Sequence, residues 1–97
     1  MLRHFEGHLE VDGIRSSKIA FALRIGKRSG SLSGEGEIEI PEDYVDTMFA
    51  NRSLHRFVAV GGQKMDIFVR RYREIGGARL ATVATSGPII GVVPEMV

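Results

Sequence analysis

Apolar and polar residues alternate along most of this chain, which is the period-two pattern of half-buried β-strands. The odd positions are apolar in 19–25, and the even positions are apolar or glycine in 32–40. If residues 26–31 form the turn between these strands, large side chains lie opposite glycines and cover them, because a strand glycine has no side chain to pack. The expected pairs are Ile25 with Leu32, Leu23 with Gly34, Phe21 with Gly36 and Ile19 with Ile38.

The N-terminal segment carries a second alternating pattern that ends in a turn signal. Within residues 2–11, Phe5, Gly7, Leu9 and Val11 lie on one face, and Asp12 and Gly13 are the residues typical of a two-residue β-hairpin. The apolar phase then shifts by one residue, so we expect a β-bulge at 15–17. The expected neighbours are Val11 with Ile14 and Phe5 with Phe21.

Residues 41–50 change the period from two to that of a helix. Pro41 suits a first helical turn, and the acidic residues after it complement the helix dipole. Four apolar residues then recur at the three- and four-residue spacing of one helical face. We expect a short helix over 42–50 whose apolar face consists of Tyr44, Val45, Met48 and Phe49.

The second half of the chain predicts three more strands, at 54–60, 65–75 and 78–85. A four-residue turn would join the first two strands, and a pair of glycines would form a tight hairpin between the last two. The segment 86–97 contains several glycines and prolines, which predicts an irregular or mobile C-terminal tail. The expected pairs are Val60 with Met65, Val58 with Ile67, Phe57 with Phe68, Glu74 with Arg79 and Tyr72 with Ala81.

This order of elements, βββ-α-βββ, predicts a mainly β fold with a single domain over residues 1–85. Two short three-stranded antiparallel meanders joined by one helix close into a small six-stranded barrel or fold into a two-layer roll. The helix between the third and fourth strands resembles the topology of the OB-fold, a likeness that several small barrels share.

Composition restricts the classes of protein to consider. The chain has 97 residues, a net charge of +1 and no cysteine, which excludes disulfides and cysteine nucleophiles. No apolar run is long enough for a transmembrane helix, and the N-terminal segment lacks the apolar middle of a signal peptide. We therefore expect a soluble cytoplasmic protein with no cofactor. Because no nucleophile elbow, helical metal motif or carboxylate pair stands out, we expect no enzymatic activity.

Two rows of charged residues are candidate ion sites. In the first row, a histidine and the next glutamate on the same strand face could jointly hold a zinc ion, but a tetrahedral site would need ligands from another strand. The second row lacks the spacing of a metal-binding loop. We interpret both rows as solvated strand faces. The first row is His4, Glu6, His8 and Glu10, and the second is Glu35, Glu37 and Glu39.

The fifth predicted strand, 65–75, is apolar on both faces for part of its length, so its second face needs a cover. The predicted helix, a second subunit or a ligand could supply that cover. Aromatic side chains interleaved with arginine are also typical of surfaces that bind single-stranded nucleic acid. The second face carries Phe68, Arg70 and Tyr72, with Phe57 on the neighbouring strand and Arg71 and Arg73 close by.

Two short strings resemble a known family. Arg24 and Arg28 form an Arg-x-x-x-Arg string, and Asn51 and Ser53 form an Asn-x-Ser string further along the chain. Together they resemble the PilZ domain, a six-stranded barrel that binds cyclic dinucleotides. The resemblance implies that the arginines contact phosphates and that the second string lines the pocket. The chain departs from the family at Arg56, where the family pattern has glycine, and in placing Arg24 within a strand, so we do not assign it to the family.

The hypothesis that follows is a non-catalytic binding or assembly module. We expect it to self-associate or to dock a protein partner through the aromatic and arginine face of the fifth strand, because aromatic residues carry much interface energy and arginine binds carboxylates directionally. The alternative is a small barrel that binds nucleic acid or a nucleotide through the same face. We expect no metal and no membrane partner. The expected binding residues are Phe57, Phe68, Arg70, Arg71, Tyr72 and Arg73.

Overall fold

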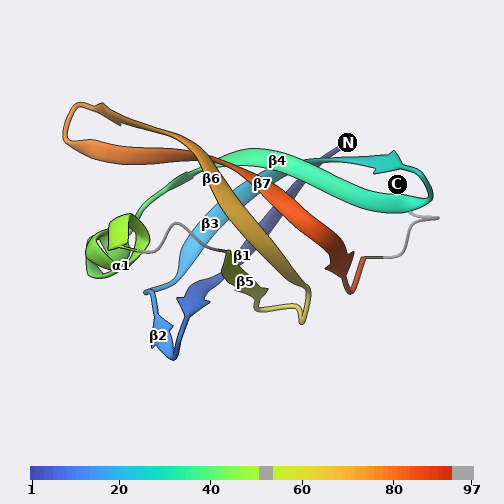
Figure 1. Ribbon diagram of the computed structural model, residues 1–97, viewed down its shortest axis with the longest axis horizontal. Coiled ribbons are helices and arrows are strands. Elements are labelled where there is room, and N and C mark those ends of the chain that lie inside the picture. The colour runs from blue at the N-terminus through green and yellow to red at the C-terminus, as the bar shows by residue number, and fades with distance from the viewer. Residues whose placement is uncertain (51–53, 93–97) are drawn as a thin grey trace.

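The computed structural model describes residues 1–50 and 54–92 (Figure 1). The first half of the chain forms strands β1 (Leu2–Val11), β2 (Ile14–Arg15), β3 (Ile19–Arg28) and β4 (Ser31–Glu39). The second half forms the 3-10 turn η1 (Glu42–Tyr44), helix α1 (Val45–Ala50) and strands β5 (His55–Ala59), β6 (Lys64–Ile75) and β7 (Ala78–Ile90).

The strands pair antiparallel in one sheet that closes on itself. The strand order is β2-β1-β3-β4-β7-β6-β5, and β5 pairs a second time with β1. Strands β1, β3, β4, β7, β6 and β5 therefore make a closed six-stranded barrel, and β2 is an extra strand beside β1. The prediction of a small antiparallel β fold with one short helix between strands is confirmed. Of the two architectures considered, a barrel and a two-layer roll, the structure shows the barrel.

The barrel interior is filled by side chains from all six strands of the barrel. The rings of Phe21 and Phe57 meet edge to face with centroids 5.3 Å apart, and Phe5 approaches Phe57 at 6.4 Å. Tyr44 of η1 and Met48 of α1 are fully buried against this core. The predicted helix at 42–50 is confirmed, with its first turn in 3-10 geometry.

The β3–β4 hairpin has the expected faces but a different register. Its turn consists of Ser29 and Gly30, both with positive φ (52° and 80°). Because the strands extend further toward this tight turn than predicted, the predicted register is wrong by two positions. The observed pairs include Lys27 with Leu32, Ile25 with Gly34 and Leu23 with Gly36.

Diagonal contacts still place large side chains over the two glycines of β4. A Cβ built on Gly34 would lie 2.8 Å from Cγ of Leu23, and a Cβ on Gly36 would lie 3.1 Å from Cε2 of Phe21. The predicted packing partners therefore meet, although their backbones are not directly opposite.

The first hairpin forms as predicted. Val11 pairs with Ile14 across the two-residue turn, and β1 then pairs with β3 in the expected register, Phe5 opposite Phe21. The phase shift is absorbed at 16–18, just after the position predicted for the bulge. There the hydroxyl of buried Ser16 accepts a hydrogen bond from the amide of Leu9 (2.9 Å).

The β5–β6 hairpin corrects the predicted register by three residues. Phe57 pairs with Met65 and His55 with Ile67, rather than Phe57 with Phe68. The turn is closed by a hydrogen bond from the amide of Ala59 to the carbonyl of Gln63 (2.8 Å). A shift by an odd number of residues changes which side chains share a face, so Phe57 lies on the core side.

Strand β7 continues to Ile90, so the prediction of an irregular tail is wrong for residues 86–90. Ile89 and Val92 are buried in the core. Gly87, with a φ of 74°, and the proline after it lie opposite a register shift in β6, which accommodates them within the strand pair. Residues 93–97 of the predicted tail lie outside the described residues.

The β6–β7 hairpin follows the predicted turn, with Glu74 opposite Arg79 and Tyr72 opposite Ala81. Figure 1 shows this hairpin extending at one end of the molecule, above α1, whereas the β3–β4 hairpin extends at the opposite end.

Candidate functional site

A β-bulge divides the predicted binding surface on β6. Arg70 has no partner on β7, because it lies between the pairs Val69–Val83 and Arg71–Thr82. A bulge inserts one residue and so reverses the alternation of side chains beyond it. Two even-numbered residues, one before and one after Arg70, therefore lie on opposite faces of the sheet.

Phe68 and Tyr72 are separated by this bulge. Phe68 pairs with Ala84 on the outer face, whereas Tyr72 pairs with Ala81, whose side chain is in the core. The expectation that both aromatic residues share one face with Arg70 is wrong, because sequence parity does not reveal the inserted residue. The guanidinium of Arg70 instead lies 5.8 Å from the ring centroid of Phe68.

Phe57 is a core residue. Its side chain is fully buried between the rings of Phe5 and Phe21, contrary to the expectation of an exposed anchor. The difference follows from the β5–β6 register, which turns Phe57 toward the barrel interior.

Beyond the bulge, β6 and β7 continue past the end of β5 as the β6–β7 arm (residues 70–80). Strand β4 pairs with β7 as far as Leu80, so only the tip of the arm, residues 74–79, is two-stranded. Six consecutive residues of β6, from Arg70 to Ile75, are exposed. In a strand, successive side chains point to opposite faces, so this run means that both faces of the arm are accessible. Ile75, at the end of β6, is 54% exposed.

Tyr72 attaches the arm to α1. Its ring stacks on Phe49 with centroids 4.5 Å apart and an interplanar angle of 32°, and its hydroxyl donates to the carbonyl of Met48 (3.3 Å). Both rings remain accessible, with exposures of 38% for Tyr72 and 49% for Phe49. We expected Phe49 on the buried helix face. No sequence signal separates it from its buried neighbours, because its exposure depends on where the helix ends relative to the barrel.

One edge of β6 is free over the length of the arm. Strand β5 pairs with β6 only as far as Ile67. Within residues 1–50 and 54–92, no strand pairs with that edge from Phe68 to Ile75. A free edge presents backbone N–H and C=O groups to which another strand can hydrogen-bond.

The arginines of the arm differ in their partners. Arg73 forms two hydrogen bonds with the carboxylate of Glu37 (3.0 and 2.7 Å), and this contact raises the pKa of Arg73 above its ordinary value. Arg71 forms no ion pair with any described residue. Arg70 and Arg79, also exposed, likewise form no ion pair with a described residue, so Arg73 differs from the other three arginines of the arm.

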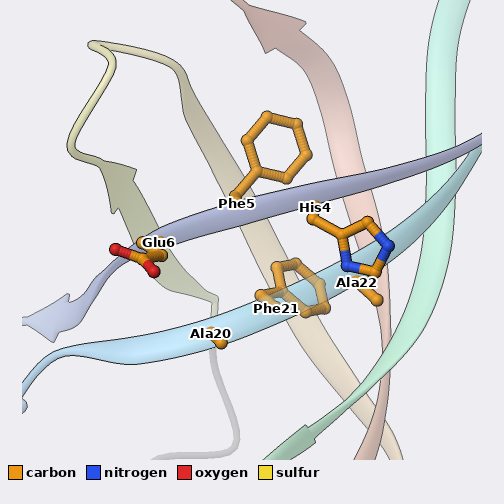
Figure 2. A pocket seen from close by; sticks show the side chains of 6 residues that line it. All are labelled: His4, Phe5, Glu6, Ala20, Phe21 and Ala22. Atoms are coloured by element: carbon orange, nitrogen blue, oxygen red, sulfur yellow. The ribbon is translucent and has the colours of Figure 1, made fainter.

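The His/Glu row of β1 lies on the outer face of the barrel. Figure 2 shows His4 and Glu6 beside Ala22 and Ala20, which border a hollow of about 500 Å³. Glu6 pairs with Lys18 (2.9 Å). In the described part of the chain, no three His, Asp or Glu side chains gather so that they could hold a metal ion.

In comparisons with known proteins, no family model, curated protein or solved structure matches this chain. The resemblance to the PilZ domain gains no support from them. Arg24 lies in β3, and Asn51 and Ser53 of the second string lie outside the described residues. None of the described helices has the length and apolar character needed to cross a membrane.

Proposed function

We propose that this protein is a non-catalytic binding module that docks an acidic, extended segment of a protein partner on the β6–β7 arm. The observation that carries the proposal is the free edge of β6 from Phe68 to Ile75, in an arm exposed on both faces. A segment that adds a strand at this edge gains main-chain hydrogen bonds, and its side chains meet those of the arm.

The aromatic pair on α1 and β6 supports docking at this place. Phe49 and Tyr72 are fixed against each other and remain partly exposed. Rigid aromatic side chains bury a large area with little loss of conformational freedom, which is why they anchor many interfaces. A partner segment on the β6 edge lies next to this pair.

The arginines beside the edge favour an acidic partner. Arg70, Arg71 and Arg73 lie on this stretch of β6 with one acidic residue, Glu74. Glu37 of β4 already pairs with Arg73, so Arg70 and Arg71 carry the charge open to a partner. Arginine binds carboxylates with two parallel hydrogen bonds, which gives direction as well as affinity. Acidic side chains of a partner strand therefore match the arm in charge.

A second copy of the chain that pairs with this edge about any of residues 70–74 brings like charges together. When two copies of one strand pair antiparallel about a two-fold axis, directly opposed residues must lie on the same face of the sheet. The pairing is therefore centred on a residue that lies opposite its own copy, and the residues on either side of it lie opposite each other. Pairs centred on 70, 71 or 73 place an arginine opposite itself, and a pair centred on Tyr72 places Arg71 opposite Arg73. A pair centred on Glu74 opposes two carboxylates, and like charges directly opposite are destabilising.

The alternative, binding of nucleic acid, assumed that Phe68 and Tyr72 lie on one face of the sheet together with arginine. These two residues lie on opposite faces, so that assumption does not hold. Self-association and nucleic-acid binding on the arm become outcomes to be tested against the acidic partner.

The test uses a fluorescein-labelled eight-residue peptide of alternating glutamate and valine, with a peptide of alternating lysine and valine as the control. Fluorescence anisotropy at low salt is expected to show binding of the acidic peptide and not of the basic one. Arg71→Glu is expected to weaken this binding about tenfold or more, because it removes a charge-assisted hydrogen bond and adds a repulsive charge.

Arg15→Glu is the matched control, since it changes the net charge equally at an exposed position on β2. It is expected to leave the affinity within about twofold, because exposed charges distant from the arm are screened. Equal binding of both peptides, or an equal loss in both variants, would contradict docking on the arm.

A further inference from the structure

A hollow of about 560 Å³ lies on the outer face of the barrel, where β4 separates from β7. The β4–β7 pairs run from Glu39 only as far as Glu35, which lies opposite Ala84. Toward the β3–β4 turn, β4 pairs with β3 alone, and Thr85 of β7 pairs with Ile67 of β6. The two strands therefore diverge and leave space between them.

Small residues form part of this hollow. Gly26, Gly34 and Ala84 line it, so ligand atoms can come close to the backbone there. A hydrogen bond from the amide of Gly34 to Oγ1 of Thr85 (2.9 Å) joins β4 to β7 at the point where the strands part. Ser33 of β4 and Thr85 of β7 also line the space.

Two arginines from different strands border the hollow, Arg24 of β3 and Arg70 of the bulge in β6. Neither forms an ion pair with a residue that the structure describes. Glu35, which lies opposite Arg24, supplies one negative charge, so the charged side chains of the lining sum to +1 (two arginines and one glutamate).

We propose that this hollow binds a phosphate monoester of a small organic molecule. The guanidiniums of Arg24 and Arg70 hold the phosphate, because the planar fork of arginine matches its oxygens. The hydroxyl group of Ser33, on the same face of β4 as Glu35, adds a neutral donor. The space exceeds what a phosphate alone needs and falls within the range of about 300–1,000 Å³ typical of small-molecule sites.

The carboxylate of Glu35 determines which monoesters fit. It repels a second phosphate and accepts hydrogen bonds from hydroxyl or amino groups of the organic part. The arrangement therefore favours one phosphate joined to a body with hydrogen-bond donors. The hollow shares Arg70 with the proposed docking surface, whereas Arg24 lies on β3 and Arg71 does not line the hollow, so variants of Arg24 and Arg71 distinguish the two sites.

The proposal is tested by isothermal titration calorimetry at low salt with adenosine 5′-monophosphate, ribose 5-phosphate and adenosine. Both monoesters are expected to bind with a stoichiometry of one, and adenosine is not. Arg24→Gln and Arg70→Gln are each expected to weaken binding about tenfold, the loss typical of one charge-assisted hydrogen bond.

Arg71→Gln is the control, because it removes the same charge from the next residue of β6, outside the hollow. It is expected to leave monoester affinity unchanged within about twofold. An absence of monoester binding up to about 10 mM, a concentration that detects even millimolar dissociation constants, would overturn the proposal. An equal loss in all three variants would also overturn it, by assigning the effect to net charge. Because Arg70 borders both sites, Arg24→Gln tests the hollow alone, and peptide binding by this variant is expected to be unchanged.

Discussion

Gly36 shows at the residue scale how little space this barrel leaves between neighbouring strands. A Cβ on Gly36 would overlap the carbonyl oxygen of Ala22 and come within 3.1 Å of the Phe21 ring. The backbone oxygen cannot move without disturbing the β3–β4 ladder. The glycine is therefore required by close packing rather than by an unusual backbone conformation.

Replacement of Gly36 by alanine is expected to lower the free energy of unfolding by about 1–3 kcal/mol, the usual cost of overpacking. Gly26→Ala is the matched control, because nothing lies within 4 Å of a Cβ there and its φ is not positive. The control is expected to be neutral or stabilising by up to about 1 kcal/mol. Chemical denaturation of the two variants measures the difference, and equal stabilities would contradict the observed packing.

Tyr44 contributes a pH dependence at the same scale. Its hydroxyl lies 2.7 Å from Nδ1 of His55 in a hydrogen bond between two buried side chains. Burial raises the pKa of Tyr44 from 10.0 to about 12, with smaller contributions from the negative charges of Glu10 and Asp12. Because the folded-state pKa is the higher one, this stabilisation is complete below pH 10 and is lost as the pH rises toward 12.

Wild-type protein is therefore expected to lose about 2–3 kcal/mol of unfolding free energy between pH 10 and 12 through this group. Tyr44→Phe is expected to be less stable at pH 8, because the hydrogen bond to His55 is absent, and to lose less stability across the alkaline range. Urea denaturation at several pH values measures both slopes. If the unfolding free energies of both proteins fell equally between pH 10 and 12, ionisation of Tyr44 would not contribute to the pH dependence of stability.

At the scale of elements, the C-terminal end of strand β7 packs against the barrel core. Ile89 is 6% exposed and packs in the core, whereas Ile90, its neighbour, is 54% exposed. The end of β7 therefore contributes to the barrel rather than forming a loose tail.

Ile89→Ala is expected to lower the unfolding free energy by about 2–5 kcal/mol, as for other large-to-small core substitutions. Ile90→Ala is expected to change it by no more than about 0.5 kcal/mol, because that side chain is largely in solvent. Thermal and urea denaturation compare the two. Similar small effects at both positions would mean that the end of β7 is not packed in solution.

The helix and strands were predictable because apolar and polar residues alternate along each strand. The change from this two-residue period to the helical period is visible within a few residues. The helix at 42–50, the two-residue turn after Val11 and the Gly76 hairpin all follow from short-range chemistry. Registers across longer turns were not predictable, since a turn can change its length or position, and so shift the register by two or three residues, without changing the alternating pattern of the strands. The end of β7 was missed because its Gly87 and proline are also turn residues.

The sequence predicts which residues the arm contains but not the faces on which their side chains lie. The sequence places Arg70, Tyr72 and Arg73 on the strand that forms the arm, as the structure does. The bulge at Arg70 and the exposure of Phe49 arise from tertiary packing, which leaves no periodic signal. A single inserted residue was enough to separate Phe68 from Tyr72 and to assign them to different surfaces.

At the scale of the whole molecule, the proposed docking of an unlike partner predicts a monomer, because self-pairing about residues 70–74 of β6 would oppose like charges. Light scattering at low and physiological salt is expected to give the mass of one chain, 10.7 kDa. Screening of the arginines by salt would strengthen any β6–β6 pairing. A dimer that forms as salt increases and is lost in Tyr72→Ser would contradict this account and support self-association through the arm.

The central claim is that an acidic segment adds a strand to the free edge of β6. The most direct measurement is a ¹⁵N–¹H NMR titration with the alternating glutamate–valine peptide, followed by amide hydrogen exchange. Strand addition is expected to give shift changes and new exchange protection confined to Phe68–Ile75, with a further response at Phe49. Changes centred on another strand, or shift changes without new protection of β6 amides, would contradict strand addition.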